Sequence, residues 1–374
     1  MTSTRPRALV AGAGVVGRSV AYPLCRLAFH VTLIDAGPDP SPATRASLGV
    51  LTHFNGGDSP LSLLYRDGHQ GYASLARDLA DQTGIDIGWR ALGGLDLILT
   101  EGDEAAAEEE VRLDQERGCP VERLDAAAVR SLEPHLAPAC RGGLYFPGDH
   151  RVNPELLCAA LLRGVVREGG QAHFGEALQG FVEAGSAGVV VRTTQGRRSA
   201  DFAVLATGAW TAELASMLRA PVPVRPVRGQ HLRFPGERVA HVVRHGGHHL
   251  LPAGGQTVVG ATVEEVGFDL STTPEAAQVL GEALARMQGT ASPPASSADG
   301  SQPGSLVDQR AGLRPKPKGG RPLIGPLRDF PRVFVATGHY RNGILMGRVT
   351  GRIVAEWMAR GEAPREMGYF APER

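Results

Sequence analysis

Three glycines near the amino terminus have the spacing of a dinucleotide-binding turn. Gly12, Gly14 and Gly17 form the pattern GxGxxG between an apolar run, RALVA, and a helical pattern. In such a turn the first glycine permits the tight bend, the second lets a pyrophosphate approach the backbone, and the third lets the helix pack on the sheet. The phosphates then lie at a helix N-terminus, where free N–H groups meet negative charge.

Asp35 ends the next strand-like run, HVTLID. It follows the glycines by about 20 residues, as the acid of a dinucleotide fingerprint does. A carboxylate there accepts hydrogen bonds from a ribose 2′-OH and repels a 2′-phosphate. The pattern therefore predicts a strand–turn–helix–strand unit that binds FAD or NAD rather than NADP.

A second glycine loop near the carboxyl end favours FAD over NAD. The segment VFVATGHYRNGILMGRVTG has the pattern of a strand, a loop and a helix start. A helix N-terminus facing a flavin ring stabilises negative charge near N1 and O2 of the reduced form. The segment ATGAW at 206–210 has a similar strand-end loop, suited to lie against the dinucleotide.

Several ordered segments resemble the glycine oxidase branch of the D-amino acid oxidase superfamily. The resemblance covers nearly the whole chain and implies non-covalent FAD, dioxygen as the electron acceptor, a two-domain fold and a homo-oligomer. It also implies that a glycine-derived imine is supplied to thiamine thiazole synthesis. The shared segments are GAGVVG, TGIDIGWRALGGL, GGLYFPGDHRVNPELL, VLATGAW, PVRGQHLRF, VVGATVEEVGFD, AGLRPKPKGGRPLIG and GHYRNGIL.

The resemblance also implies which residues contact a substrate. Arg314 in AGLRP matches the carboxylate-binding arginine of the family, and Arg341 in GHYRNGI matches a second arginine beside the flavin. A guanidinium fork suits a carboxylate because it forms two parallel hydrogen bonds. His249 stands where the family has a pocket tyrosine, and Ala253 stands where it often has an arginine. These two departures leave the preferred substrate open.

The residues that the resemblance assigns to the cofactor lie in four places. They belong to the first glycine turn and the strand after it, the region of the pyrophosphate, the 206–210 loop, and the 339–345 loop. They are Gly12, Gly14, Val15, Val16, Gly17, Asp35, Ser47, Leu178, Thr207, Gly208, Trp210, His339, Arg341, Asn342, Gly343, Ile344 and Leu345.

The reaction expected is the oxidation of glycine or another small amino acid. The flavin takes a hydride from Cα, so the protein has to hold the carboxylate and exclude water, and no general base is assigned. Alternatives are an oxidase of sarcosine or another N-methyl amino acid, and a D-amino acid dehydrogenase that reduces a quinone. An NAD-dependent dehydrogenase and a flavin-binding scaffold without turnover also remain open.

The order of predicted elements indicates an α/β fold. A Rossmann-like FAD-binding domain, residues 1–55, 145–215 and 310–374, is interrupted by an α+β substrate domain with a mainly antiparallel sheet, residues 56–144 and 216–309. Helical periodicity extends over 61–82, and the acidic segment after residue 100 predicts an exposed helix. The low-complexity run at 290–305 predicts a surface loop.

Composition excludes several other classes. The formal net charge is zero and no basic stretch stands out, so no nucleic-acid partner is expected. No apolar run approaches the roughly 20 residues of a membrane helix, and no signal peptide is evident, so we expect a cytoplasmic protein without a membrane partner.

Cysteines and clustered histidines suggest no metal site. The four cysteines, Cys25, Cys119, Cys140 and Cys158, form no CxxC pair and are expected to be small buried hydrophobes. Four histidines lie close together in sequence with no acid or cysteine among them, and Gly246–Gly247 predicts a turn. We interpret them as solvated turn histidines: His241, His245, His248 and His249.

Overall fold

The computed structural model describes residues 5–52, 56–290, 306–364 and 367–373. Its nucleotide-binding part is built on a six-stranded sheet with the order β19-β20-β13-β1-β2-β9. Neighbours from β20 to β9 are parallel, and β19 pairs antiparallel at one edge. The strands are β1 (Arg7–Ala11), β2 (His30–Asp35), β9 (Gln171–Phe174), β13 (Phe202–Leu205), β19 (Leu323–Leu327) and β20 (Phe330–Thr337).

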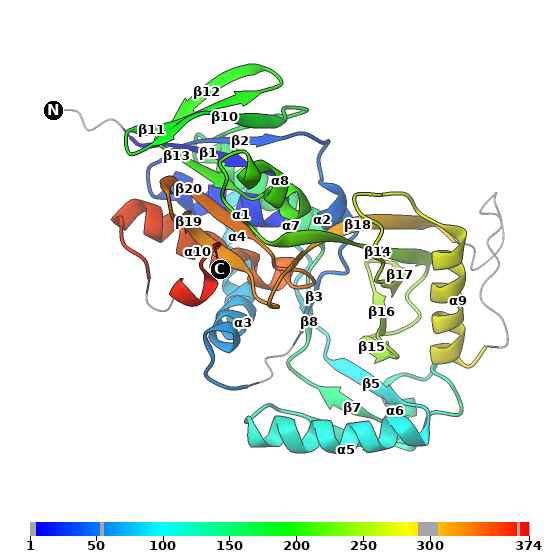
Figure 1. Cartoon of the computed structure of the whole chain (residues 1–374). Helices are drawn as coiled ribbons and strands as arrows, with labels where there is room; N and C mark the ends of the chain where they lie inside the picture. Colours follow the sequence, from blue (N-terminus) through cyan, green and yellow to red (C-terminus); the bar gives the residue numbers. More distant parts are fainter. Residues whose placement is uncertain (1–4, 53–55, 291–305, 365–366, 374) are drawn as a thin grey trace.

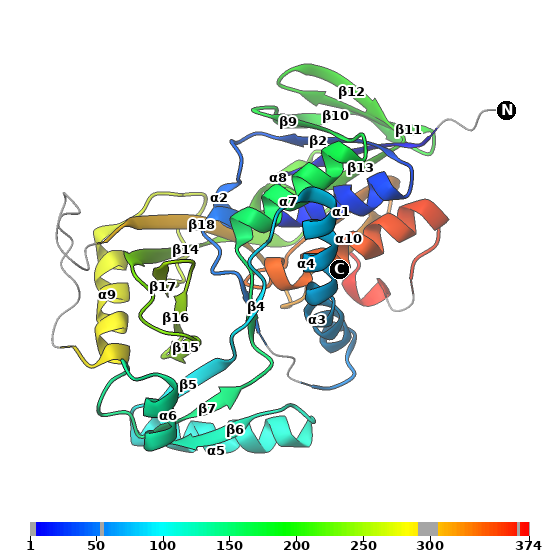
Figure 2. The same ribbon diagram turned by 180° about the vertical axis from the view of Figure 1, so that it is seen from behind.

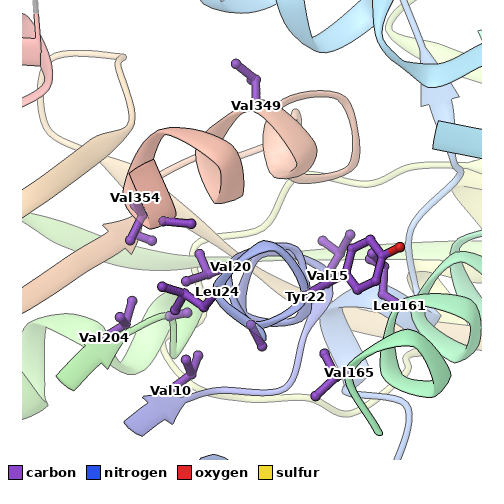
Figure 3. Close-up of a cluster of buried hydrophobic side chains, with 14 of the residues drawn as sticks. Val10, Val15, Val20, Tyr22, Leu24, Leu161, Val165, Val204, Val349 and Val354 are labelled. Atoms are coloured by element: carbon purple, nitrogen blue, oxygen red, sulfur yellow. The ribbon is translucent and has the colours of Figure 1, made fainter. Parts of the chain in front are cut away.

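Helices cover one face of this sheet, and a small antiparallel sheet covers the other (Figure 1). On the helical face Val10 and Val204 pack with α1 (Val15–Arg26), α7 (Pro154–Arg167) and α10 (Gly343–Arg360). Figure 3 shows α1 surrounded by apolar side chains of β1, β13, α7 and α10. On the opposite face lie β10 (Leu178–Gly185), β11 (Gly188–Thr193) and β12 (Gly196–Ala200), with η1 (Gly208–Trp210) and α8 (Thr211–Ser216) beside them.

The predicted helical run at 61–82 forms two helices, α3 (Pro60–Gln70) and α4 (Tyr72–Thr83), which meet at Gly71. Leu64, Tyr72 and Leu79 join the apolar cluster of α1 and α10, and α3 packs on α10 (Figure 2). Residues 60–83, assigned from sequence to the substrate domain, thus pack on the helical layer of the six-stranded sheet because their apolar stripe faces that layer.

A second, eight-stranded sheet has the order β18-β14-β17-β16-β15-β5-β7-β6. All neighbours are antiparallel except β15 and β5. Most of β18 lies beyond residue 310, where the sequence analysis began a segment of the FAD-binding domain, but the strand belongs to this eight-stranded sheet because it pairs with β14. The strands are β5 (Gly94–Ile98), β6 (Glu122–Asp125), β7 (Gly142–Phe146), β14 (Val224–Pro235), β15 (Val242–His245), β16 (His248–Pro252), β17 (Gln256–Gly260) and β18 (Asp308–Pro317).

The two faces of the eight-stranded sheet have different neighbours. Helix α9 (Pro274–Gln288) covers one face over β14, β16 and β17, and Figure 1 shows it at the outer side of the sheet. At β18 the sheet meets α2 (Pro42–Arg45) of the nucleotide-binding part. Short strands join the two regions: β3 (Val50–Leu51), β4 (Arg90–Ala91) and β8 (His150–Arg151).

The acidic segment after residue 100 forms a helix, as predicted. Helix α5 (Glu101–Glu116) is largely exposed and begins with a capping box between Thr100 and Asp103. Two short elements, α6 (Ala126–Leu132) and η2 (Met367–Phe370), complete the fold. All four cysteines are buried, as predicted, and none of them forms a disulfide. Most of the low-complexity run, residues 291–305, lies outside the described residues. Within the described ranges no helix is long and apolar enough to cross a membrane.

Candidate active site

The first glycine turn has the shape that its sequence predicts. Gly12 has a φ of +102°, and a Cβ there would lie 2.3 Å from the carbonyl oxygen of Ala206. A Cβ on Gly17 would lie 1.7 Å from the carbonyl oxygen of Gly12. Only glycine fits both positions, because α1 and the end of β13 approach the turn this closely.

The N-terminus of α1 is open toward a ligand. Gly14 is the N-cap and supplies no side-chain acceptor, and the N–H of Val15 donates to Thr44 Oγ1 at 3.2 Å. The N–H groups of Val16 and Gly17 have no intrahelical acceptor, as at any helix start. Such N–H groups bind a pyrophosphate.

Hydroxyl groups from the segment after β2 lie beside this N-terminus. A Cβ on Gly14 would lie 3.2 Å from Ser41 Oγ and 3.6 Å from Thr44 Oγ1. Ser47, which the sequence assigned to this region, follows α2, and its Oγ accepts from the N–H of Gly49 at 3.3 Å. Sequence reasoning missed Ser41 and Thr44. Their signal was a hydroxyl-bearing helix cap, S-P-A-T, between Asp35 and Ser47.

Asp35 lies at the carboxyl end of β2, beside the glycine turn. Its Oδ2 accepts from the N–H of Ala13 at 2.6 Å, and its Oδ1 accepts from that of Gly37 at 2.8 Å. Each carboxylate oxygen keeps acceptor capacity for a ribose hydroxyl. Leu178 starts β10 nearby, two residues after Glu176, whose N–H donates to the Asp35 carbonyl at 2.8 Å.

A buried arginine, Arg18, holds the first glycine turn in place through hydrogen bonds. Arg18 is fully buried, and its guanidinium donates to the carbonyls of Ala13 at 2.6 Å and Cys158 at 2.9 Å and pairs with Asp39. This arrangement fixes the loop that carries the second glycine. The sequence analysis missed Arg18, because a polar residue inside an apolar helical pattern carries no signal of its own.

The second strand-end loop, Thr207–Trp210, lies where β13 ends. The hydroxyl of Thr337 on β20 donates to the carbonyl of Gly208 at 2.9 Å, which joins the ends of two adjacent parallel strands. The Trp210 ring lies near Phe268, with centroids 5.4 Å apart, and is partly exposed. Trp210 thus contacts the 261–273 loop of the substrate side.

The third loop leads from β20 into α10. His339 is buried and its Nε2 lies 2.9 Å from Thr350 Oγ1. Burial lowers the pKa of His339 to about 4. Asn342 is the N-cap of α10 without a capping side chain, since its amide donates to the Tyr65 hydroxyl of α3 instead.

The start of α10 is therefore a second open helix N-terminus. The N–H of Met346 is the first to find an intrahelical acceptor, the carbonyl of Asn342. The N–H groups of the three preceding residues remain for a ligand: Gly343, Ile344 and Leu345. The sequence analysis did not predict the contact of Tyr65 with Asn342, because Tyr65 was recognised only as one apolar position of a helix.

Arg314 is the strongest candidate for holding an anion. Its Nη1 donates to the carbonyl of Thr262 at 2.9 Å, and the carbonyl of Arg228 lies 3.4 Å away. No carboxylate of the described residues forms a salt bridge with it. Burial, followed by the positive charge of Arg341, lowers the pKa of Arg314 to about 10. A partly buried cation that no described carboxylate contacts directly favours an anionic ligand.

Arg341 and His249 share the environment of Arg314. Arg341 is exposed, and no salt bridge joins it to a described acid; its guanidinium lies 5.5 Å from the Tyr340 ring centroid. Burial, followed by the charge of Arg244, lowers the pKa of His249 to about 4, and Arg341 adds to this effect. The positive charge of Arg341 thus acts on both of the other two predicted substrate residues.

His249 lies beside a charged cluster that sequence reasoning did not find. Arg244 pairs with His249 across β15 and β16, and its guanidinium forms salt bridges with Asp96 and Asp149. Arg244 and Asp149 are almost completely enclosed. This cluster joins β15, β5 and the loop before β8, and so holds the strand that carries His249.

The interpretation of the clustered histidines as solvated was wrong for three of them. His241 Nδ1 lies 2.8 Å from Glu133, His245 Nε2 lies 3.2 Å from Asp103, and His249 is largely buried. The acids come from other elements, so sequence proximity could not show them. The predicted turn at Gly246–Gly247 is correct. Among the described residues no group of three or more potential ligands could hold a metal ion.

One cavity lies away from all of these residues. It has a volume of about 480 Å³ and lies at the amino ends of β1 and β2, beside β12, where Arg7, His30 and Arg197 line it. Dinucleotides bind at the carboxyl ends of parallel strands, so this cavity is on the wrong edge of the sheet for the cofactor.

Comparison with known proteins gives the class. The FAD dependent oxidoreductase family matches residues 7–357, and the chain belongs to it. Glycine oxidase of Geobacillus kaustophilus is 30% identical over 374 residues, covering 98% of this chain and 96% of the relative.

Solved structures of the same class are closely similar. The crystal structure of glycine oxidase from Geobacillus kaustophilus superposes with a TM-score of 0.90 at 28% identity, covering 99% of both chains. The crystal structure of iminodiacetate oxidase from Chelativorans sp. BNC1 has a TM-score of 0.85 at 25% identity, covering 98% of this chain and 99% of that one. This chain is an FAD-dependent oxidoreductase, and its two open helix N-termini, glycine turn and Asp35 suit that cofactor.

Proposed function

We propose that the chain oxidises the C–N bond of a small amino acid, glycine or sarcosine, to an imine while dioxygen is reduced to hydrogen peroxide. The observation that carries this proposal is Arg314, a partly buried guanidinium with no salt-bridge partner among the described residues. A free α-carboxylate would supply the missing counter-ion through two parallel hydrogen bonds. The glycine oxidases among the similar proteins support the same substrate class.

Arg314 and the residues near it have different roles in binding and orienting the substrate. Arg314 holds the carboxylate and so sets the direction of the Cα–H bond. His249, neutral at pH 7, and Arg341 line the same environment. FAD supplies hydride acceptance and the transfer of electrons to dioxygen. No side chain is assigned as a general base, because the hydride leaves Cα of a neutral amine. The imine is released and hydrolyses, or serves thiamine thiazole synthesis as the family resemblance implies.

A substrate panel tests this proposal. Glycine, sarcosine, D-alanine and D-proline are offered to the purified holoenzyme while oxygen uptake and peroxide are measured. We expect turnover with glycine or sarcosine and one peroxide for each dioxygen consumed. Turnover only with an added quinone would make the protein a D-amino acid dehydrogenase. No turnover of any amine by the FAD-loaded protein would support a non-catalytic scaffold.

Iminodiacetate is a second candidate substrate. It is glycine with a carboxymethyl group on nitrogen, so it carries a second carboxylate. Arg341 is an exposed guanidinium that forms no salt bridge with a described acid, and it lies close enough to Arg314 to lower the pKa of that residue. Iminodiacetate therefore belongs in the panel. A kcat/KM for it above that for glycine, lost in Arg341→Ala, would favour this assignment.

The cofactor assignment of Asp35 has its own test. Asp35→Ala removes acceptors for the ribose hydroxyls, at a cost of about 1–3 kcal/mol in FAD binding. FAD occupancy after purification should fall. Asp201→Ala is the matched control, because Asp201 also accepts a main-chain N–H, that of Arg7 at 2.6 Å, but at the surface. Unchanged FAD affinity in Asp35→Ala would reject the assignment.

We also propose that FAD is bound without a covalent link. No cysteine follows Cys158 in the sequence, so none lies in the flavin loop at 339–345. Acid precipitation should leave the yellow colour in the supernatant, whereas a yellow pellet would reject the proposal. The two-domain division, the homo-oligomer and the cytoplasmic location remain proposals of the sequence analysis.

A further inference from the structure

The carbonyl groups that hold Arg314 belong to a hydrogen-bonded assembly around Glu264. Beyond the end of β17, residues 262–264 run antiparallel to residues 228–230 of β14. The N–H of Arg228 donates to the Glu264 carbonyl at 2.8 Å, and the N–H of Glu264 donates back to the Arg228 carbonyl at 2.9 Å. The N–H of Thr262 donates to the carbonyl of Gln230 at 3.1 Å.

The Glu264 side chain joins the same three residues. Its Oε2 accepts from Nε and Nη2 of Arg228 at 3.0 and 2.6 Å, and Gln230 Nε2 lies 3.0 and 3.2 Å from its two oxygens. The Thr262 hydroxyl donates to Oε1. Arg228 and Gln230 are buried, and the Glu264 side chain is 23% exposed. Charge-assisted hydrogen bonds of this kind are strong and directional.

These contacts leave one edge of the Arg314 guanidinium free. Nη1 donates to the carbonyl of Thr262, with that of Arg228 nearby, whereas Nε and Nη2 form no hydrogen bond with any of the described residues. The guanidinium lies over Gly229, where a Cβ would be 2.0 Å from Nη2. An Nε–Nη2 edge is one of the two edges on which arginine binds a carboxylate bidentately.

We propose that Glu264 is a positioning residue, which fixes the carbonyls of Thr262 and Arg228 and thereby directs the free edge of Arg314 toward the substrate carboxylate. This inference rests on the proposed function for the carboxylate itself. Glu264 acts on the substrate carboxylate only through Arg314, both by holding Thr262 and Arg228 and by its negative charge, which acts on the Arg314 guanidinium directly.

The experiment measures binding of acetate, the simplest carboxylate, to the holoenzyme through the change in the FAD absorbance spectrum. Glu264→Gln keeps the shape of the side chain and removes its charge. We expect the Kd of acetate and the KM of the amino acid to rise about tenfold, since hydrogen bonds to a charged group are lost. The effect on kcat should be smaller. In an Arg314→Ala background, Glu264→Gln should add little, because both changes act through one contact.

Glu104→Gln is the matched control. Like Glu264, Glu104 accepts from Nε and Nη2 of one arginine through a single oxygen, here those of Arg141 at 3.2 and 3.0 Å, and it lies on α5 outside the cofactor and substrate regions. It should leave acetate binding unchanged. An acetate Kd in Glu264→Gln equal to that of the wild type would overturn the inference, as would an equal rise in the control.

Two further variants keep the outcomes distinct. If Glu264→Gln does not retain FAD, Thr262→Val removes the hydroxyl that donates to Glu264 and accepts from the N–H of Gln230 at 2.8 Å, and it should weaken acetate binding in the same direction; an unchanged Kd would then overturn the inference. Arg314→Ala tests the proposed function separately. Unchanged acetate binding in Arg314→Ala would reject the carboxylate site itself, whereas weakened binding there with normal binding in Glu264→Gln would reject only the role of Glu264.

Discussion

The two faces of the eight-stranded sheet are built from the same strands but carry different side chains. Under α9, Leu232, Val259 and Leu250 lie in register across β14, β17 and β16 and pack on Leu284 in an apolar cluster, which the buried Arg228 and Gln230 adjoin further along β14. The other face carries His231, Gly260, His249 and Arg244 across the same strands and β15, beside a smaller apolar cluster of Val242, Leu251 and Val258. Arg314 lies on that face too, over Gly229.

This difference follows from the period of a β-strand. Successive side chains point to opposite faces, so a strand such as β16 places His249 on one side and Leu250 on the other. The apolar face removes surface from water and stabilises the domain. The polar face retains buried charges and imidazoles that reduce stability unless they are paired. We therefore expect substitutions on the two faces to affect different quantities.

The largest expected effect is the loss of Arg314 from the polar face. Arg314→Ala should lower kcat/KM for glycine or sarcosine by about 2–5 kcal/mol, as for other buried hydrogen-bonded charge pairs. Since orientation sets the path of the hydride, kcat should fall together with affinity. Arg314→Lys should recover only part, because lysine is a point charge without the planar fork.

The measurement is steady-state kinetics with FAD content checked by absorbance. A loss of less than about threefold in kcat/KM, under 1 kcal/mol, in an Ala variant that keeps FAD would show that another residue holds the carboxylate. Arg341 would then be the first alternative.

Leu250 tests the apolar side of this comparison, where a substitution should affect stability rather than catalysis. Its side chain is fully buried, so Leu250→Ala should lower the free energy of unfolding by about 2–5 kcal/mol through lost burial and a cavity. Urea unfolding of the holoenzyme measures this. Below the unfolding transition, kcat/KM should stay near the wild-type value. A loss of kcat/KM as large as that of Arg314→Ala, with FAD retained, would contradict the division between the faces.

A smaller effect is expected in the pH dependence of stability. Burial lowers the pKa of His231 and, followed by the charge of Arg244, that of His249, each to about 4. The unfolded chain, with a histidine pKa of about 6.5, binds more protons between these values. Stability should therefore be present above about pH 6.5 and fall as the pH drops toward 4, by up to about 1.4 kcal/mol per pH unit for each residue.

His249→Asn tests this through the slope. Its free energy of unfolding should fall less between pH 6.5 and pH 5 than that of the wild type. The exposed His135→Asn is the control and should keep the wild-type slope. An unchanged slope in His249→Asn would show that His249 is not held neutral by its site.

Local sequence alone determined the nucleotide-binding unit. The strands Arg7–Ala11 and His30–Asp35 have the predicted bounds, and the glycines between them occupy a turn that admits no Cβ at Gly12 or Gly17. Apolar periodicity and glycine spacing are short-range signals, so they survive without tertiary information. Arg314 and Arg341 were chosen from motifs, and the structure places them in one environment.

Only the tertiary structure decided how those residues are held. Asn342 meets Tyr65 across 277 positions of sequence, and Arg314 meets Thr262 across 52. The tertiary structure also brings His241 next to Glu133 and packs α3 on α10 in the nucleotide-binding part. Such contacts depend on which sheet faces and helix stripes are buried against each other. A local sequence pattern shows which face of an element is buried but does not show which element packs against it, because burial of apolar surface is non-directional. The packing of the layers then determines which polar side chains meet.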